Sequence, residues 1–420
     1  MLDIKFIREN AEKVQKSSKD KGIDVDIQEL LRLDEEHRTL FSQVQNLYSQ
    51  RNVAAKERNV EKGKSLKSEI STKETRLLDL KNELDTLLYS IPNPAKDDVK
   101  IGKDESENEI VKTVGTPKKF GFKPKDHLEL GESLDIIDIQ RAAKVSGARF
   151  AYLKNEGVLL EFALQQFAFD TLVKEGFIPV IPPVLIKESV MKGLGYMENG
   201  GDEDMYHLEK DGLVLVGTAE HALVPLHMDE TFQKKDLPRR YVGFSPAFRR
   251  ESGSYGKDTR GIFRVHQFNK VEMVSFVAGE DDDNEHAFLL DLEEKFFQAL
   301  DIPYQVVKMC TGDLGFPAAR KYDIEAWMPT QEKYREVTSC STTTDFQSRR
   351  LNTKYLPAGR QGLVGSDKKF VQILNGTAFA VGRTIIAILE NYQEEDGSVV
   401  IPEVLRKYTN YVKKISPILK

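Results

Sequence analysis

The stretch FRRESGSYGKDTRGIFRVHQFNKVEM, residues 248–273, decides the fold of this 420-residue chain. Two adjacent arginines stand one residue before a carboxylate, and a loop of small and charged residues leads into an alternating segment typical of a strand. Returning strands joined by this loop would gather five side chains around one cleft: Arg249, Glu251, Arg264, Phe268 and Glu272. Guanidinium groups suit phosphate, a carboxylate accepts from an exocyclic amine, and an aromatic face suits a base. The pattern fits a nucleotide site.

The same pattern also fits a hairpin with a solvated, charged loop. The chain contains neither a G-x-x-x-x-G-K-[ST] phosphate loop nor a G-x-G-x-x-G motif after a strand. A bound nucleotide would therefore be held by arginine side chains, where those motifs use backbone amides at a helix start.

A second informative stretch is NGTAFAVGRTIIAILENYQEEDGSVVIPEVLRKY, residues 375–408. It predicts a small-residue turn and then an apolar helix over residues 378–392, interrupted by Gly382 and Arg383. An arginine within so hydrophobic a helix is costly to bury unless it meets an anion or an aromatic ring. Arg383 is therefore expected to lie beside an anion or an aromatic ring.

Together the two stretches resemble motifs 2 and 3 of the class II aminoacyl-tRNA synthetases, and in detail those of the seryl-tRNA synthetases. The segment EFALQQFAFDTLVKEGFIPVIPPVL, residues 161–185, is similar to motif 1: a long helix, a glycine stop and a strand ending in Pro182-Pro183. The resemblance runs from the opening MLDIKFIREN to the end of the chain, and it includes IPNP at 91–94 and TGDLGFPAARKYDIEAWMP at 311–329. Arg-x-Glu alone is weak, whereas the ordered set is specific.

The resemblance implies an ATP site with Mg²⁺. Arg249 would bridge the α-phosphate and the serine carboxylate, and Arg383 would cover the base and reach the terminal phosphate. Glu336 would act with these two arginines in catalysis. The implied ATP contacts are Arg249, Arg250, Glu251, Val265, Phe268, Glu336, Val337, Thr338, Ser339 and Arg383, and the implied metal ligands are Glu336 and Ser339. From the residues alone, Phe268 also fits a core position, and Arg250 and Arg264 also fit ion pairs.

For L-serine, the resemblance implies contacts from Thr218, Ala219, Glu220, Arg249, Glu272 and Thr377. Thr218 and Glu220 would hold the ammonium and Thr377 the hydroxyl, although Thr218 and Glu220 also fit the start of a helix. The implied reaction is attack of the serine carboxylate on the α-phosphorus of ATP, then transfer to tRNA(Ser), with tRNA(Sec) as a further expected acceptor. A carboxylate is already ionised at pH 7, so the first step needs no general base.

Composition and charge limit the binding partners and the cellular compartment that we expect. The net charge is −6 with 30% charged residues, so no global basic field points to nucleic acid and RNA contacts must be local. The two cysteines, Cys310 and Cys340, have no zinc-site spacing and indicate a reducing compartment. The N-terminus lacks the pattern of a signal peptide, and no apolar run reaches the ~20 residues that span a bilayer. We expect a soluble, cytoplasmic protein that binds neither membrane nor DNA.

Two heptad seams organise the N-terminal part. One runs through Leu30, Leu33, His37, Leu40, Val44, Leu47, Arg51 and Ala54, and the other through Leu66, Ile70, Lys73, Leu77, Leu80, Leu84, Leu87 and Ile91. A predicted turn at residues 62–64 would fold them into an antiparallel hairpin over about 27–90, although heptads also form dimeric coiled coils. Basic residues gather toward its tip: Arg51, Lys56, Arg58, Lys62, Lys64, Lys67, Lys73 and Arg76. In the family such an arm lies on tRNA.

The chain thus divides into a tRNA-binding domain, 1–100, and a class II catalytic domain, 101–420, with a polar linker to about Gly115. Predicted strands lie at 213–217, 240–244, 270–276, 304–309, 322–328 and 370–374, and a further helix at 283–300. Consecutive strands often join directly, which favours an α+β fold whose mixed, mainly antiparallel sheet is flanked by helices. The resemblance also implies a homodimer.

Two departures from the family pattern stand out. The family's E-V-S-S reads Glu336-Val337-Thr338-Ser339 here, which keeps the hydroxyl. LPAGRQGLVGSDKK, residues 356–369, is predicted to be an inserted surface loop. Two other functions remain open: a tRNA-binding paralogue without catalysis, and an armless type of ligase that loads amino acids onto carrier proteins.

Overall fold

The computed structural model describes residues 1–252, 258, 260–357 and 368–417. The chain forms two compact units, Met1–Pro94 and Ala95–Lys420. Each unit has hydrophobic clusters of its own.

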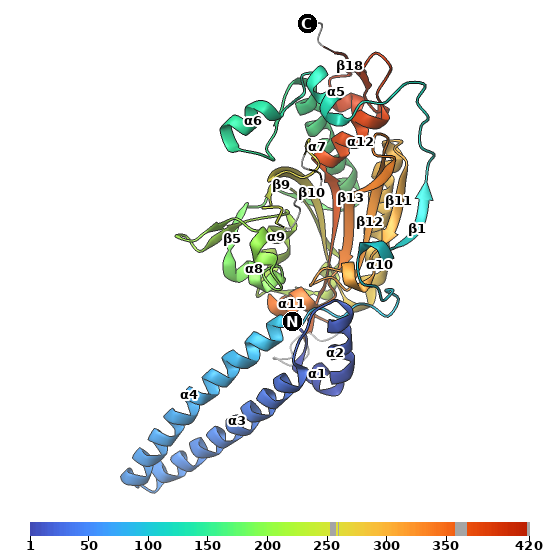
Figure 1. Cartoon of the computed structure of the whole chain (residues 1–420). Coiled ribbons are helices and arrows are strands. Elements are labelled where there is room, and N and C mark those ends of the chain that lie inside the picture. The colour runs from blue at the N-terminus through green and yellow to red at the C-terminus, as the bar shows by residue number, and fades with distance from the viewer. Residues whose placement is uncertain (253–257, 259, 358–367, 418–420) are drawn as a thin grey trace. The chain divides into compact units, whose positions relative to one another are not determined.

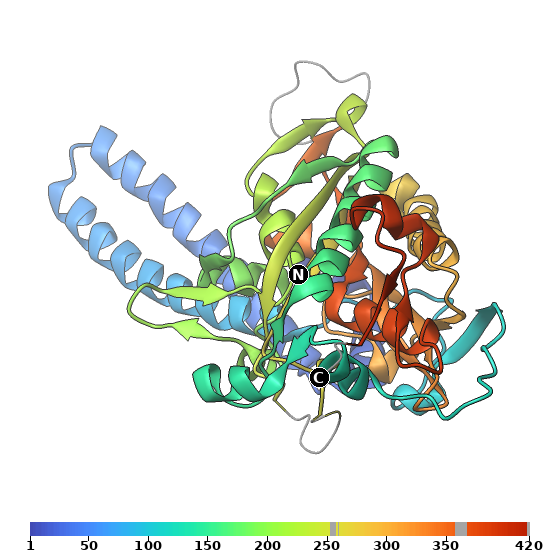
Figure 2. The ribbon, with the colours of Figure 1, turned by 90° about the horizontal axis from the view of Figure 1, so that it is seen from above.

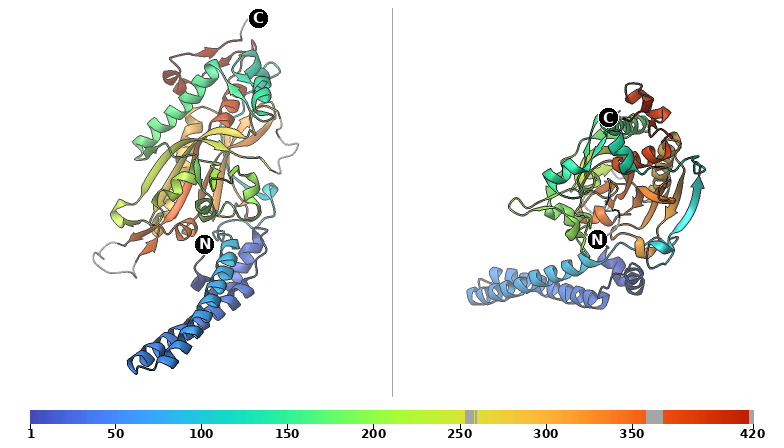
Figure 3. Two further views of the ribbon diagram at one scale, coloured as in Figure 1. Left: turned by 90° about the vertical axis from the view of Figure 1, so that its left-hand side faces the viewer. Right: turned by 45° about the horizontal axis from the view of Figure 1, so that its top comes forward.

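In the first unit, helices α3 (Ile27–Lys56) and α4 (Val60–Ser90) lie side by side as a hairpin (Figure 3). Seam residues from both helices are buried: Leu30, Leu33, Val44, Leu47, Ala54, Leu66, Ile70, Leu80 and Leu84. The predicted intrachain pairing is therefore confirmed. The short helices α1 (Ile4–Glu9) and α2 (Ala11–Asp20) bring Ile7 and Val14 into the same core as the hairpin's base.

The predicted position of the hairpin turn is wrong. Residues 62–64 lie inside α4, and the chain reverses at 57–59. Arg58 adopts φ 53°, and the Asn59 side chain accepts a hydrogen bond from Lys62 N at 3.0 Å. An asparagine cap at the helix start supplies an acceptor that Gly63 lacks, which explains why the helix begins before the glycine.

The second unit is built on a mixed sheet that has eight strands in the described part of the chain (Figure 1). Their order is β1 (Glu109–Val114), β11 (Tyr304–Lys308), β12 (Arg320–Met328), β13 (Lys333–Thr342), β16 (Gln372–Ala380), β10 (Gln267–Val277), β9 (Arg239–Phe248) and β4 (Ile178–Val180). Neighbours are antiparallel except β4 and β9, which are parallel. The α+β fold is confirmed.

Three helices pack on the sheet: α7 (Asn155–Lys174), α10 (Asp282–Ala299) and α12 (Val381–Asn391). Their apolar faces meet the sheet in one large core, which includes Phe167, Phe296 and Phe379. Figure 2 shows α7 beside the C-terminal segments, where the 3₁₀ helix Glu403–Tyr408 packs on it. This core supports the strands that carry the candidate site.

Smaller elements surround the sheet. The helices are α5 (His127–Ser133), α6 (Ile139–Ser146), α8 (Glu188–Leu194), α9 (Glu220–Leu223) and α11 (Phe346–Arg350). The strands are β2 (Ile137–Asp138), β3 (Tyr152–Leu153), β5 (Leu185–Lys187), β6 (His207–Leu208), β7 (Leu213–Leu215), β8 (Thr231–Gln233), β14 (Lys354–Leu356), β15 (Lys369–Phe370), β17 (Val399–Val400) and β18 (Lys414–Ile415).

Three local predictions need correction. The polar linker contains strand β1, which pairs with β11 despite its exposed side chains. The expected turn at Asn375 is the middle of β16, because both of its edges are paired with β13 and β10. Helix α12 consequently starts at Val381, so Gly382 and Arg383 lie in its first turn and do not interrupt it. Residues 358–367 of the predicted insertion lie outside the described part of the chain.

Candidate active site

A cavity of about 460 Å³ opens in the second unit, above strands β9, β10, β13 and β16 and the start of α12. Most of the predicted site residues line this cavity: Thr218, Glu220, Arg249, Glu251, Val265, Phe268, Glu336, Val337, Thr338, Ser339, Thr377 and Arg383. Ala219, Arg250 and Glu272 do not line it. Strand pairing thus brings together residues more than 150 positions apart in sequence.

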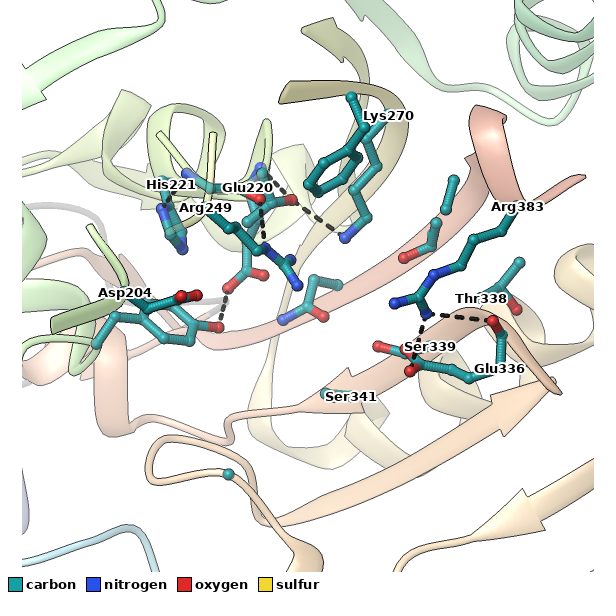
Figure 4. A pocket seen from close by; sticks show the side chains of 18 of the residues that line it. Asp204, Glu220, His221, Arg249, Lys270, Glu336, Thr338, Ser339, Ser341 and Arg383 are labelled. Atoms are coloured by element: carbon teal, nitrogen blue, oxygen red, sulfur yellow. Dashed lines mark hydrogen bonds and ion pairs between the residues drawn. The ribbon is translucent and has the colours of Figure 1, made fainter. Parts of the chain in front are cut away.

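Glu272 lies one layer behind the cavity wall, on β10. It is directly opposite Thr377 of β16, whose hydroxyl donates to its Oε2 at 3.4 Å. Lys270 Nζ forms an ion pair with the same Oε2 at 2.7 Å and donates to Thr218 Oγ1 at 3.2 Å (Figure 4). One lysine therefore links the Thr218 segment to the buried carboxylate.

The two buried carboxylates at this end of the cavity, Glu220 and Glu272, both have raised pKa values. Burial, opposed by the Lys270 charge, raises the pKa of Glu272 to about 7, and the nearby Glu220 contributes to the rise. Burial also raises the pKa of Glu220, against hydrogen bonding from Tyr196 and the charge of Lys270. A cation entering here would favour the ionised form of both groups.

Thr218 and Glu220 are also arranged as the helix-start alternative predicts. The Glu220 amide donates to Thr218 Oγ1 at 3.3 Å, although Ala219 is the residue that precedes α9. Thr218 is thus one residue before the N-cap, and its side chain lines the cavity.

Arg249 reaches into the cavity from the end of β9 (Figure 4). Its Nε donates to Gly217 O at 3.1 Å, and its guanidinium carbon lies 5.3 Å from the centre of the Phe268 ring. Phe268 is only half-buried, so its ring is available at the cavity wall as well as packing on the core. The Arg249 side chain is thus oriented by a carbonyl and an aromatic face.

Arg383 and Glu336 form an ion pair of 3.0 Å on the opposite side of the cavity (Figure 4). Arg383 also donates to the Glu336 carbonyl at 3.2 Å and lies over the Phe263 ring, 4.8 Å from its centre. Although burial opposes the shift, the charges of Arg383 and Lys321 lower the pKa of the Glu336 carboxyl. Glu336 is therefore an anion throughout the neutral range.

The side chains of Arg250 and Arg264 have other partners. Arg250 donates to the Met205 carbonyl at 2.8 Å and lies over the Tyr206 ring, outside the cavity. Arg264 forms an ion pair with Glu251 at 3.2 Å and contacts Asp258 at 3.4 Å, which matches the ion-pair alternative for this residue.

Known proteins of similar sequence identify the family of this chain. Residues 1–95 match the seryl-tRNA synthetase N-terminal domain, and residues 206–392 match the class II tRNA synthetase core domain (G, H, P, S and T). The serine–tRNA ligase of Dictyoglomus thermophilum is 43% identical over 99% of this chain and 100% of its own length. That of Thermobifida fusca is 45% identical over 97% of both chains. The chain belongs to the seryl-tRNA synthetase family.

Solved structures agree with this family. Seryl-tRNA synthetase from Pyrococcus horikoshii complexed with ATP superimposes with a TM-score of 0.92 at 41% identity, covering 100% of both chains. Cytoplasmic serine–tRNA ligase from Naegleria fowleri in complex with AMP gives 0.90 at 32% identity, covering 100% of this chain and 99% of its own. The predicted enzyme class, serine–tRNA ligase, is confirmed. The match over 1–95 disfavours the armless alternative.

The oxygen donors in this seryl-tRNA synthetase fold suit Mg²⁺. Among the described residues, no cluster of three or more His, Cys, Asp or Glu side chains could hold a metal alone. Glu336 and Ser339 do line the cavity together, and Mg²⁺ in nucleotide sites commonly takes one or two carboxylates plus phosphate oxygens and water. No helix in the described ranges is long and apolar enough to span a bilayer.

Several residues of the cavity wall were not predicted from the sequence, among them Lys270, Phe263 and Tyr196. Lys270 is two positions before Glu272 on one strand, so the period-2 alternation places both on one face and could have revealed it. Phe263 lies between the Arg335 and Arg383 guanidinium groups, 4.2 and 4.8 Å from its centre, and stands beside Arg264 in the quoted stretch. Tyr196 carries no motif signal, because it lies in the connection that follows α8.

Proposed function

We propose that the chain activates L-serine with ATP and transfers the seryl group to tRNA(Ser), with tRNA(Sec) as a second acceptor. A serine carboxylate oxygen bonds to the α-phosphorus while the bond from that phosphorus to the bridging oxygen breaks, giving seryl-adenylate and diphosphate. A terminal ribose hydroxyl of the tRNA then attacks the seryl carbonyl carbon, its proton leaves, and AMP departs.

The observation that carries this proposal is the distribution of charge around one cavity. Glu220, with Glu272 behind it, supplies a negative end that suits the serine ammonium. Arg249 and Arg383 supply cations that suit a carboxylate and phosphates. Bringing two anions together requires positioning and neutralisation, and the Arg249 guanidinium lies in the cavity over the Phe268 ring.

Each remaining residue has a proposed contact. Phe268 stacks beneath adenine and Glu251 accepts from its amine, while Val265 and residues 337–338 supply backbone contacts. Thr377, directly opposite Glu272, accepts or donates at the serine hydroxyl. Arg250 is proposed for ATP only through its backbone, because its side chain faces Met205. The two relatives are complexed with ATP and with AMP, which supports a nucleotide as a ligand of this chain.

Mg²⁺ would be held by Glu336 and Ser339, and when bound it neutralises phosphate charge. Arg383 orients one of these two proposed metal ligands. Arg383 holds the Glu336 carboxylate at the cavity wall, and the lowered pKa keeps that carboxylate ionised at neutral pH.

The arm is proposed to hold the tRNA. Of its basic residues, Arg76 already forms ion pairs with Glu36 and Glu83, and Lys73 donates to Gln43 at 2.8 Å. Phosphate contacts are therefore expected from the exposed set nearer the turn: Lys56, Arg58, Lys62, Lys64 and Lys67.

Homodimerisation is proposed through the motif 1 region. Side chains of α7, β4 and the following segment leave apolar surface in solvent: Phe162, Val173, Ile178 and Ile181, the last 85% exposed. Such a row is typical of a protein interface. Sedimentation velocity should give a dimer for the whole chain and a monomer for Ile181→Asp.

ATP–pyrophosphate exchange with a panel of amino acids tests the proposed function. Serine alone should support exchange, and tRNA(Ser) and tRNA(Sec) transcripts should both accept radiolabelled serine. A chain that binds tRNA(Ser) without any exchange would be the non-catalytic paralogue instead.

A further inference from the structure

Tyr196 has no role in the function proposed above, yet it lines the same cavity. It lies in the connection between α8 and the 3₁₀ helix Gly201–Asp204. Its hydroxyl donates to Glu220 Oε1 at 2.7 Å. Glu220 is the carboxylate proposed to hold the serine ammonium, so the hydroxyl acts on a group that would contact substrate.

Packing fixes the direction of this hydroxyl. The Tyr196 ring lies 4.6 Å from the His221 ring and packs against the hydrophobic cluster that contains Val216 and Leu223. His221 is itself held, because its Nδ1 accepts a hydrogen bond from Gly217 N at 3.2 Å. Burial, together with the charges of Arg249 and Lys270, lowers the pKa of His221 to about 3. The ring beside Tyr196 is therefore neutral at working pH and is held by a hydrogen bond.

We propose that Tyr196 is a positioning residue for the amino acid: its hydroxyl holds the Glu220 carboxylate in the direction that meets the serine ammonium. The inference rests on the proposed function and adds a residue to it. Gln347 also hydrogen-bonds the Glu220 carboxylate, so without the Tyr196 hydroxyl Glu220 would keep its negative charge less readily and would lose one of these two orienting contacts.

The electrostatic surroundings give this role a signature in pH. The groups facing Glu220 are Tyr196, Lys270 and Glu272 of β10, Arg249 at the end of β9, and His221 of its own helix. Burial raises the pKa of Glu220, and hydrogen bonding from Tyr196 opposes that rise. Removing the hydroxyl must therefore raise the pKa of Glu220 further. At a given pH below neutrality more of the variant is protonated, and a neutral acid attracts an ammonium group less.

The test is Tyr196→Phe in the full chain, measured by serine-dependent ATP–pyrophosphate exchange between pH 5.5 and 8.5. Losing a hydrogen bond to a charged group predicts a KM for serine raised about 10-fold. The kcat should stay within about 2-fold and the KM for ATP should not change, because the hydroxyl contacts no nucleotide group. The acid limb of kcat/KM for serine should move about 0.5–1 unit to higher pH.

Tyr241→Phe is the matched control. Its hydroxyl contacts His227 Nε2 at 2.8 Å and its ring belongs to the same hydrophobic cluster, but it does not line the cavity. This control should keep the wild-type KM and the wild-type acid limb, so any stability effect of losing a packed hydroxyl is measured separately.

An unmoved acid limb with an unchanged serine KM in Tyr196→Phe would overturn the inference. So would an equal shift in the Tyr241→Phe control, because the effect would then come from general loosening. In both cases the wild-type chain would still exchange with serine and the proposed function would stand. Absence of serine-dependent exchange in the wild-type chain would instead sink the proposed function and this inference together.

Discussion

The arm and the cavity are built from sequence in opposite ways. The arm's distal core consists of Leu47, Ala54, Leu66 and Ile70, which lie on two consecutive helices and repeat at heptad spacing. The cavity gathers side chains from Tyr196 to Arg383 across four strands and a helix start. Local periodicity is sufficient for the first, whereas the second depends on strand pairings between distant segments. Perturbations should therefore separate the two regions.

Arg249→Ala should give the largest effect, and only on the cavity. Removing the cation that neutralises charge on the α-phosphate should lower serine-dependent pyrophosphate exchange by about 10²–10³-fold. The arm should keep its affinity for tRNA(Ser), measured by filter binding. Near-normal exchange in this variant would remove Arg249 from the reaction and undo the assignment of the motif.

Replacing residues 27–89 with a short Gly/Ser linker is the reciprocal experiment. Exchange should stay within a few-fold of the intact chain, whereas transfer to tRNA should fall by about 100-fold, since the phosphate contacts of the arm are lost. The slope of log affinity for tRNA against log salt should flatten by about one unit for each lost contact. Collapse of exchange as well would show that the arm is needed for the structure of the catalytic unit.

Thr377→Ala tests a single hydrogen bond within the cavity. Loss of the Thr377 hydroxyl should reduce the preference for serine over alanine by roughly 1–3 kcal/mol. The serine hydroxyl would then lose a hydrogen-bond partner, whereas alanine would lose nothing. The ratio of kcat/KM for the two amino acids measures this. An unchanged ratio would mean that another residue reads the hydroxyl.

Ile70→Ala should have the smallest effect, confined to the arm. Ile70 is buried between the two long helices, and its truncation should destabilise the hairpin by about 2 kcal/mol. Leu78→Ala is the control on the same helix, since Leu78 is 59% exposed and should cost less than about 0.5 kcal/mol. Amide hydrogen exchange should show faster opening of α3 and α4 in Ile70→Ala, with pyrophosphate exchange unaltered in both variants.

The sequence predicted best where one physical pattern dominates. Heptad spacing located the hairpin, and alternation located β9, β10 and β12. The turn between the helices was misplaced because Gly63 is a stronger pattern signal than the Asn59 cap that begins α4. β13 was not predicted as a strand, because REVTSC is dominated by polar residues that face a cavity and the opposite face of the sheet.

The candidate site likewise contains residues that the sequence predicted and residues that it did not. Residues inside recognisable motifs, such as Arg249 and Arg383, were named from sequence and lie at one cavity. The role of Tyr196 could not be predicted from the sequence, because it depends on a contact with Glu220, 24 positions away. Arg249 and Arg250 both lie beyond the end of β9, where strand alternation no longer applies, so the sequence could not show that Arg249 enters the cavity while Arg250 turns to Met205.

Three ion pairs lie at or beside the cavity: Lys270 with Glu272, Arg383 with Glu336, and Arg264 with Glu251. The protein therefore carries its own counterions, and an arriving zwitterion or polyphosphate exchanges one set of ion pairs for another. Few mobile salt ions are released by that exchange, so small-substrate KM values should depend weakly on ionic strength. The tip lysines of the arm are exposed to solvent, and the affinity of the arm for RNA should therefore fall steeply as the salt concentration rises. One chain would then respond to the same salt in two different ways.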